Sequence, residues 1–118
     1  MDELIRTNLD FSNFNYLMNI KDSIIDPLGK NISEDIKWLE LEKKWGISKF
    51  PVVISGEGSP VLCLHGFDSS FLEFRRIYPS LKKNYQLIIP DLLGFGFSPR
   101  ISGITYNPEN IISNLIDL

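Results

Sequence analysis

The fold of this 118-residue chain is decided by one stretch, which reads Val61-Leu62-Cys63-Leu64-His65-Gly66-Phe67-Asp68-Ser69-Ser70. An apolar run ends at His65-Gly66 and continues into small polar residues, a pattern typical of a core strand that stops at a tight turn. Backbone N–H groups at such a turn have no strand partner and point into a site. The stretch therefore predicts a buried strand whose end presents backbone donors.

A second stretch, residues 87–100, reads Leu-Ile-Ile-Pro-Asp-Leu-Leu-Gly-Phe-Gly-Phe-Ser-Pro-Arg. We expect a strand from Tyr85 to Ile89 and then a glycine-rich loop. Between the two stretches, apolar residues at helical spacing predict one helix face, made of Phe71, Phe74, Ile77, Tyr78 and Leu81. Asn107-Pro108 indicates the start of a last helix, which runs to Leu118. The order strand, helix, strand, helix predicts an α/β fold with a parallel sheet.

The first part of the chain predicts short helices and a hairpin. Tyr16 to Ile25 follow helical spacing before Pro27 and Gly29, and residues 33–36 are expected to open a further helical turn. Partial alternation from Trp38 to Trp45 predicts a strand. Gly46 supplies a turn, and Phe50 to Ser55 is expected to be the antiparallel partner strand.

Together the His-Gly turn and the Asp-x-x-Gly-x-Gly-x-Ser loop resemble two successive motifs of the α/β-hydrolase family, at the separation that this family shows. The resemblance covers about residues 50–118. It is strongest to α/β-hydrolases of cyanobacteria and plastids, whose N-terminal extension is similar to Asp26-Pro27-Leu28 and Ile36-Lys37-Trp38. The resemblance implies that the chain forms the N-terminal portion of an α/β-hydrolase sheet and that this sheet is incomplete. The portion consists of an antiparallel hairpin followed by a parallel β-α-β-α arrangement. Residues 1–45 are expected to form an N-terminal extension with the first strand, and residues 46–118 a hydrolase domain truncated before the nucleophile.

The same resemblance assigns the site. It implies that the backbone N–H of Phe67 is one of two donors of an oxyanion hole, which binds the charge that acyl transfer places on a carbonyl oxygen. The residues expected to shape this site are His65, Gly66, Asp68, Ser69, Gly94 and Gly96. His65 is the only histidine, and the family's catalytic histidine lies much later, so we expect His65 to hold the turn by hydrogen bonds.

Two residues of the loop could be mistaken for catalytic groups. Ser98 sits in Gly96-Phe97-Ser98-Pro99-Arg100, where an arginine replaces the final glycine of a nucleophile elbow. Pro99 also removes the N–H that an elbow would use as an oxyanion donor. We therefore expect Ser98 to order the loop. In the family the aspartate at the position of Asp91 is structural, and no proton transfer is assigned to it.

No Gly-x-Ser-x-Gly elbow occurs in the sequence, so nucleophile, acid and catalytic histidine are expected to be absent. The apolar, uncapped end at Leu118 leads us to expect a chain that is cut short. When complete, the protein is expected to hydrolyse an ester, amide or epoxide-type bond, and this chain alone is expected to be inactive. Two alternatives stay open: a non-catalytic relic or interaction protein, or one half of a two-chain enzyme whose partner covers the exposed sheet edge.

Composition limits the partners. A net charge of −3 gives no basic surface for nucleic acid, and no stretch approaches the roughly 18 apolar residues of a membrane span. The N-terminus lacks a secretory signal, so we expect a cytoplasmic protein that acts on a small molecule. The single cysteine, Cys63, lies in an apolar strand and is expected to be a buried hydrophobe. No metal-ligand spacing or nucleotide motif is present, and the family works without a cofactor.

Overall fold

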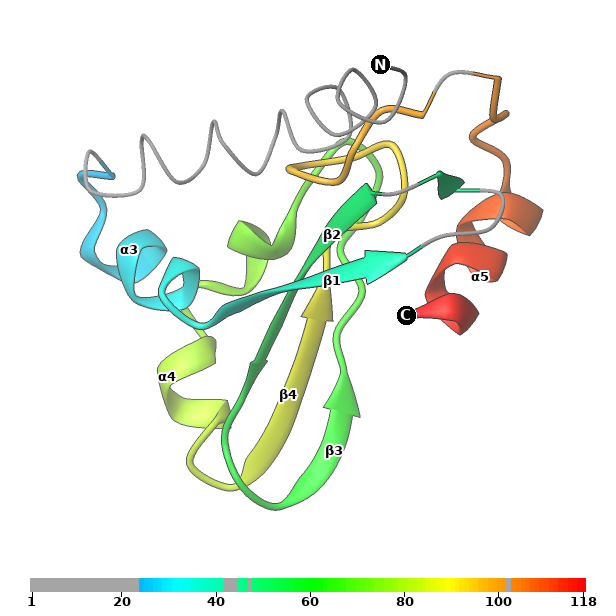
Figure 1. The fold of residues 1–118 in the computed structure, drawn as a ribbon. Coiled ribbons are helices and arrows are strands. Elements are labelled where there is room, and N and C mark those ends of the chain that lie inside the picture. Colours follow the sequence, from blue (N-terminus) through cyan, green and yellow to red (C-terminus); the bar gives the residue numbers. More distant parts are fainter. Residues whose placement is uncertain (1–23, 42–44, 47, 102) are drawn as a thin grey trace.

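The computed structural model describes residues 24–41, 45–46, 48–101 and 103–118, which form a sheet with helices on both sides (Figure 1). Within these ranges, no helix has the length and apolar character that crossing a membrane requires. The strands are β1 (Ile36–Leu41), β2 (Ser48–Ser55), β3 (Ser59–Leu62) and β4 (Tyr85–Pro90). The helices are α3 (Pro27–Ser33), the 3-10 helix η3 (Phe71–Phe74), α4 (Tyr78–Leu81) and α5 (Pro108–Asp117).

The four strands lie in the order β1-β2-β4-β3. β1 and β2 form an antiparallel hairpin in which Ile36 lies opposite Val53. β2 continues the sheet antiparallel to β4, and β3 lies parallel to β4 with Val61 opposite Leu87. The predicted α/β fold, a hairpin followed by parallel strands with a helical crossover, is therefore confirmed.

The expected boundary between residues 1–45 and 46–118 falls between the two paired strands of this hairpin. Residues 1–23 of the expected extension, including most of the Tyr16–Ile25 segment, lie outside the described residues. The division into two parts stays a prediction.

Alternate residues of the strands face the two sides of the sheet, because successive side chains of a strand point in opposite directions. Val53, Leu87 and Ile89 are buried with side chains from α3, η3 and α4, namely Ile32, Phe71 and Tyr78. Their neighbours Val52, Ile54 and Ile88 line an apolar pocket of about 290 Å³ on the other side, together with Leu115 and Leu118 at the end of the chain. This explains why the middle of β4 is apolar without interruption.

A second cluster joins the hairpin to α5 across this other face. Trp45, Phe50 and Leu93 are buried together, and Ile111 and Leu118 pack against them. The Trp45 indole N–H donates to Asp117 Oδ2 over 2.7 Å. α5 begins as predicted: the Asn107 side chain accepts from the Asn110 N–H over 2.8 Å, and Pro108 stands in the first turn, where its missing N–H costs nothing.

The single helix expected over residues 71–81 is wrong, because the chain forms η3 and α4 with a turn between them. A continuous helix would place Pro79 in its interior, where the ring removes a hydrogen bond and clashes with the preceding turn. Instead α4 starts at Tyr78 and Pro79 stands in its first turn. Phe71 and Tyr78 still reach the same core.

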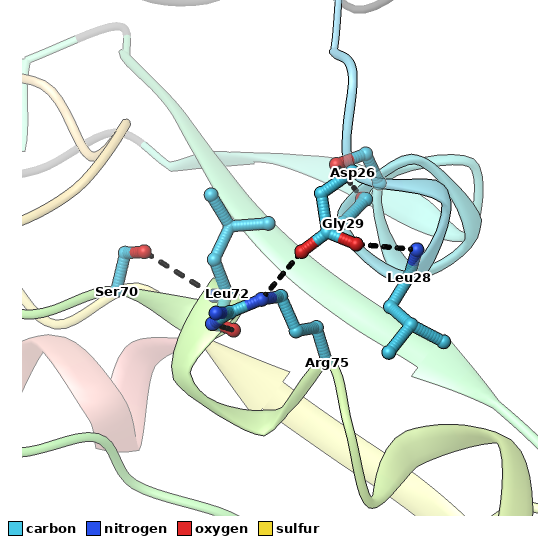
Figure 2. A network of polar contacts seen from close by, with 7 residues as sticks. Asp26, Leu28, Gly29, Ser70, Leu72 and Arg75 are labelled. Atoms are coloured by element: carbon cyan, nitrogen blue, oxygen red, sulfur yellow. Dashed lines mark hydrogen bonds and ion pairs between the residues drawn. The ribbon is translucent and has the colours of Figure 1, made fainter.

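The interpretation of residues 26–36 is also corrected. Pro27 begins α3, which includes Gly29, and the Asp26 carboxylate caps this helix by accepting from the Leu28 N–H over 3.0 Å (Figure 2). The helix expected before Pro27 lies mostly outside the described residues. Ser33 ends that helix and does not open a further turn, and β1 starts at Ile36. Proline fits the first turn of a helix as well as a loop, so its presence alone does not decide between start and stop.

Candidate functional site

The chain turns after β3 at His65, whose ring is buried with 4% of the residue exposed. The Leu92 N–H donates to His65 Nε2 over 3.0 Å, so Nε2 is an acceptor. The other ring nitrogen, Nδ1, lies 2.8 Å from the carbonyl oxygen of Gly66, which can only accept. A neutral imidazole has one donor and one acceptor nitrogen. The two contacts together therefore require the tautomer with the proton on Nδ1.

This ring fixes the peptide that links Gly66 to Phe67. The peptide bonds of the described residues are trans, so the Phe67 N–H points opposite to the Gly66 carbonyl that His65 holds. Within the described residues the Phe67 N–H has no hydrogen-bond partner. The Phe67 side chain is 91% exposed and meets the Phe95 ring edge-on, with the centroids 5.4 Å apart. The turn thus presents one oriented and unpaired backbone donor.

The preceding peptide is held from η3. The Gly66 N–H donates to Glu73 Oε2 over 3.1 Å, and the Ser69 hydroxyl also binds this carboxylate. These two hydrogen bonds, from Ser69 first, lower the pKa of Glu73. A Cβ at Gly66 would meet only Glu73 Oε2, at 4.0 Å, so the space beside the turn is open. Asp68 is exposed and turns the chain with a φ of 56°, a left-handed conformation that aspartate adopts more readily than most residues.

Asp91 ties the turn to the glycine-rich loop. Its carboxylate is fully buried and accepts from the Phe71 N–H over 2.6 Å and from the Phe97 N–H over 2.7 Å. Burial raises the pKa of Asp91 to about 6, and the two N–H donors oppose this shift. The backbone carbonyl of Asp91 accepts from the Ser98 hydroxyl over 2.7 Å. Asp91 thus orders the loop and η3 together.

Gly94 and Gly96 determine the conformation of the glycine-rich loop. Both have positive φ, 87° and 55°. A Cβ at position 94 would lie 2.9 Å from the Tyr106 ring, and one at position 96 would lie 2.2 Å from Asp91 Oδ2. Only glycine allows this conformation with such close approach.

The structure brings His65, Gly66, Phe67, Asp68 and Ser69 together in one turn and places the loop with Gly94 and Gly96 against it through His65 and Phe95. Ser98, in the same loop, is fully buried. Sequence reasoning missed Glu73. Ser70-Phe71-Leu72-Glu73 has the pattern of a capping box, which predicts that the glutamate returns to the N–H of Ser70. In the structure Glu73 reaches past it to Gly66.

No group of three or more His, Cys, Asp or Glu side chains suited to a metal occurs in the described part of the chain. Cys63 is free and partly buried, and burial raises the pKa of its thiol. The expectation that it is buried within a strand is wrong, because β3 ends at Leu62 and is an edge strand.

Comparison with known proteins agrees with this architecture. Residues 59–113 match the model of the family described as "alpha/beta hydrolase fold". The 2-hydroxy-6-oxo-2,4-heptadienoate hydrolase of Pseudomonas putida is 35% identical over 63 residues, which cover 51% of this chain and 23% of that protein. The soluble epoxide hydrolase of Corynebacterium sp. is 40% identical over 48 residues, which cover 41% of this chain and 17% of that protein.

A solved structure shows the same likeness. A mutant of the meta-cleavage product hydrolase from Pseudomonas fluorescens IP01 superposes with a TM-score of 0.55 at 32% identity, over 58% of this chain and 26% of that one. The chain therefore spans about a quarter or less of the length of these three relatives.

Proposed function

We propose that the chain, whose residues 59–113 match the model of the alpha/beta hydrolase fold family, is a member of this family and supplies the first half of the oxyanion hole of a hydrolase. The Phe67 N–H is the donor, and its role is to bind the oxygen that becomes negatively charged when a nucleophile attacks the substrate. The observation that carries this proposal is that the Phe67 N–H is oriented through His65 yet unpaired within the described residues. A donor fixed before the reaction needs no reorganisation when the charge develops.

The complete enzyme would cleave an ester, amide or epoxide-type bond of a small molecule. The relative named as a soluble epoxide hydrolase supports an epoxide substrate, and the relative named as a heptadienoate hydrolase supports hydrolysis of a small molecule without stating the bond. The work of this part of the chain is to position one donor and the aromatic surface formed by Phe67 and Phe95. The nucleophile, its general base and the second donor would come from other residues.

The 118 residues alone are expected to be inactive. Catalysis by a serine needs a base within hydrogen-bond reach of its hydroxyl. Both ring nitrogens of His65 face backbone groups, and the buried Ser98 hydroxyl donates to the Asp91 carbonyl. In the described part of the chain no serine is paired with the histidine.

The donor role is tested by two substitutions at one position in the native protein, expressed from its own gene. Phe67→Pro removes the N–H and Phe67→Ala removes only the side chain. Loss of one oxyanion donor lowers kcat by about 10²–10³, so we expect a loss of this size in Phe67→Pro and a much smaller one in Phe67→Ala. Equal kcat values for the two variants, with both folded, would contradict the proposal.

The prediction of inactivity is tested separately on the purified chain with short-chain p-nitrophenyl esters. No turnover above the uncatalysed rate is expected. Turnover that disappears in Ser98→Ala or His65→Gln would contradict it. The mass of the native protein, detected with an antibody against residues 1–50, decides which form acts in the cell, because this chain alone weighs 13.5 kDa.

One observation favours a second candidate, a half-enzyme completed by another polypeptide. β3 is an edge strand in the sheet order, and the apolar side chains Leu62 and Leu64 on and after it are 56% and 47% exposed. Unpaired strand edges with apolar neighbours accept further strands. A native mass of 13.5 kDa together with co-purification of a second chain carrying a nucleophile elbow would support this candidate.

A further inference from the structure

We propose that Glu73 is a positioning residue for the oxyanion turn: its carboxylate holds the peptide between His65 and Gly66, and through it the direction of the Phe67 N–H. The inference deepens the proposed function and rests on it. Glu73 lies on η3, seven positions after Gly66, and accepts from the Gly66 N–H over 3.1 Å. The Ser69 hydroxyl binds the same carboxylate from the other end of the turn.

Gly66 makes such a restraint necessary. A glycine rotates about its backbone more freely than any other residue, so the two peptides that flank it can reorient independently. The peptide after Gly66 is held by His65 through its carbonyl oxygen. The peptide before Gly66 is held by Glu73 through its N–H. With both restraints the direction of the next N–H, that of Phe67, is set from two sides.

η3 can serve as a fixed anchor because its own cap and two separate parts of the fold hold it. The Phe71 N–H donates to the buried Asp91 carboxylate over 2.6 Å. Ser70 Oγ accepts from the Leu72 N–H over 3.2 Å, at the start of η3. Directly after η3, Arg75 Nε donates to Asp26 Oδ2 over 2.8 Å, which links the segment to the cap of α3 (Figure 2).

The chemistry of the carboxylate points to positioning and not to charge stabilisation. Glu73 carries a negative charge at neutral pH, since hydrogen bonds from Ser69 and Gly66 lower its pKa. A negative group beside the turn cannot stabilise an oxyanion by its charge. The charge of Glu73 can instead strengthen the hydrogen bond from the Gly66 N–H, because hydrogen bonds to ionised acceptors are the stronger ones.

The test uses the 118-residue chain labelled with ¹⁵N and three variants: Glu73→Gln, Glu73→Ala and the control Glu40→Gln, which removes an exposed carboxylate on β1. Residual dipolar couplings give the directions of the Gly66 and Phe67 N–H vectors, and amide exchange gives their protection. We expect couplings that fit the structure in the wild type and in Glu40→Gln. In Glu73→Ala both couplings should depart from it, and Gly66 should exchange roughly five- to tenfold faster.

Glu73→Gln removes the negative charge of the side chain and keeps an oxygen that can accept a hydrogen bond. Its amide oxygen can still accept, so most of the wild-type couplings should be retained. As pH is lowered from 7 to 3, Asp91, whose pKa is about 6, titrates first, and the Gly66 N–H resonance should then show a second, lower step from Glu73, whose pKa is lowered. This lower step should be absent in Glu73→Gln. A merely structural role of the side chain would not make one amide resonance report its protonation.

Unchanged couplings at Gly66 and Phe67 in a folded Glu73→Ala variant, or a step below that of Asp91 that Glu73→Gln retains, would overturn the inference. These readouts need no catalysis, so they stand apart from the test of the oxyanion donor. If Phe67→Pro leaves kcat intact while Glu73→Ala reorients the turn, the proposed function fails and the positioning of the turn by Glu73 stands. If Phe67→Pro lowers kcat while Glu73→Ala leaves the turn unchanged, the Phe67 N–H stands as the oxyanion donor and the positioning role of Glu73 is rejected.

Discussion

The Asp91 carboxylate occupies the place that a side chain at position 96 would need, since a Cβ there would lie 2.2 Å from Asp91 Oδ2. The Phe97 N–H, next in the chain, donates to the same oxygen over 2.7 Å. The buried acid and the glycine thus define one loop conformation, in which the backbone of residues 96–97 wraps the carboxylate. The loop in turn carries Leu92, whose N–H holds His65.

Gly96→Ala is therefore expected to be strongly destabilising. A left-handed alanine costs about 1–2 kcal/mol and the forced displacement of Asp91 a further 1–3 kcal/mol. Gly103→Ala is the matched control, because Gly103 also has positive φ, 81°, with nothing within 4 Å of its missing Cβ. The free energy of unfolding from urea titration should fall clearly more in Gly96→Ala. Equal losses would mean that the contact with Asp91 adds no strain.

Asp91→Asn is expected to lower stability by about 1–3 kcal/mol, even though it removes a buried charge. Each carboxylate oxygen accepts one backbone N–H, from Phe71 and from Phe97. The amide nitrogen of asparagine can only donate, so one N–H would lose its acceptor. Urea denaturation at pH 7 measures the change; an unchanged or higher free energy of unfolding would show that the charge costs more than the lost bond.

Asp91 also predicts a pH dependence of stability. Its pKa is raised to about 6 in the folded chain from 3.8, because burial disfavours the charged form. The folded state then binds more protons between these values, so the contribution of Asp91 is fully present below about pH 4 and is lost as pH rises through 6. The loss is on the order of 3 kcal/mol. Urea titrations between pH 4 and pH 7 should show this slope in the wild type and lack it in Asp91→Asn.

Asn114→Leu is expected to stabilise the chain. Asn114 is fully buried in α5, and both polar atoms of its side chain lack a hydrogen-bond partner among the residues that the structure describes. Such a group costs about 1–3 kcal/mol, and leucine has a similar size without that cost. The control is Asn110→Leu in the same helix, because Asn110 Nδ2 donates to the Thr105 carbonyl over 2.7 Å. Thermal unfolding should show a higher Tm for the first variant only.

The ring state of His65 is directly measurable. The two contacts of the ring require a neutral imidazole with the proton on Nδ1. Long-range ¹H–¹⁵N correlation spectra distinguish the two tautomers by their nitrogen shifts. We expect the Nδ1-protonated pattern at pH 7. An Nε2-protonated ring would leave the Leu92 N–H without an acceptor and contradict the described geometry.

Local patterns in the sequence suffice to predict part of this fold. The hairpin, the parallel strand pair and the cap at Asn107 followed from alternation, apolar runs and one capping pair, and each was confirmed. These features depend on residues near one another in the chain. The helical turn expected to start at Ser33 and the single helix expected over residues 71–81 were wrong. Pro27 and Pro79 each stand in the first turn of a helix, and proline alone is compatible with either a helix start or a helix end.

The sequence by itself determined the class of fold and the position of the turn at His65-Gly66-Phe67, because apolar runs of strand length pack into a sheet and a glycine after such a run permits a tight turn. Only the tertiary structure decided how that turn is held. Glu73 binds Gly66, Leu92 fixes the tautomer of His65, and Asp91 joins η3 to the glycine-rich loop. These contacts join residues 7 to 27 positions apart. A hydrogen bond at such separations depends on how the strands and helices pack, which no local pattern encodes.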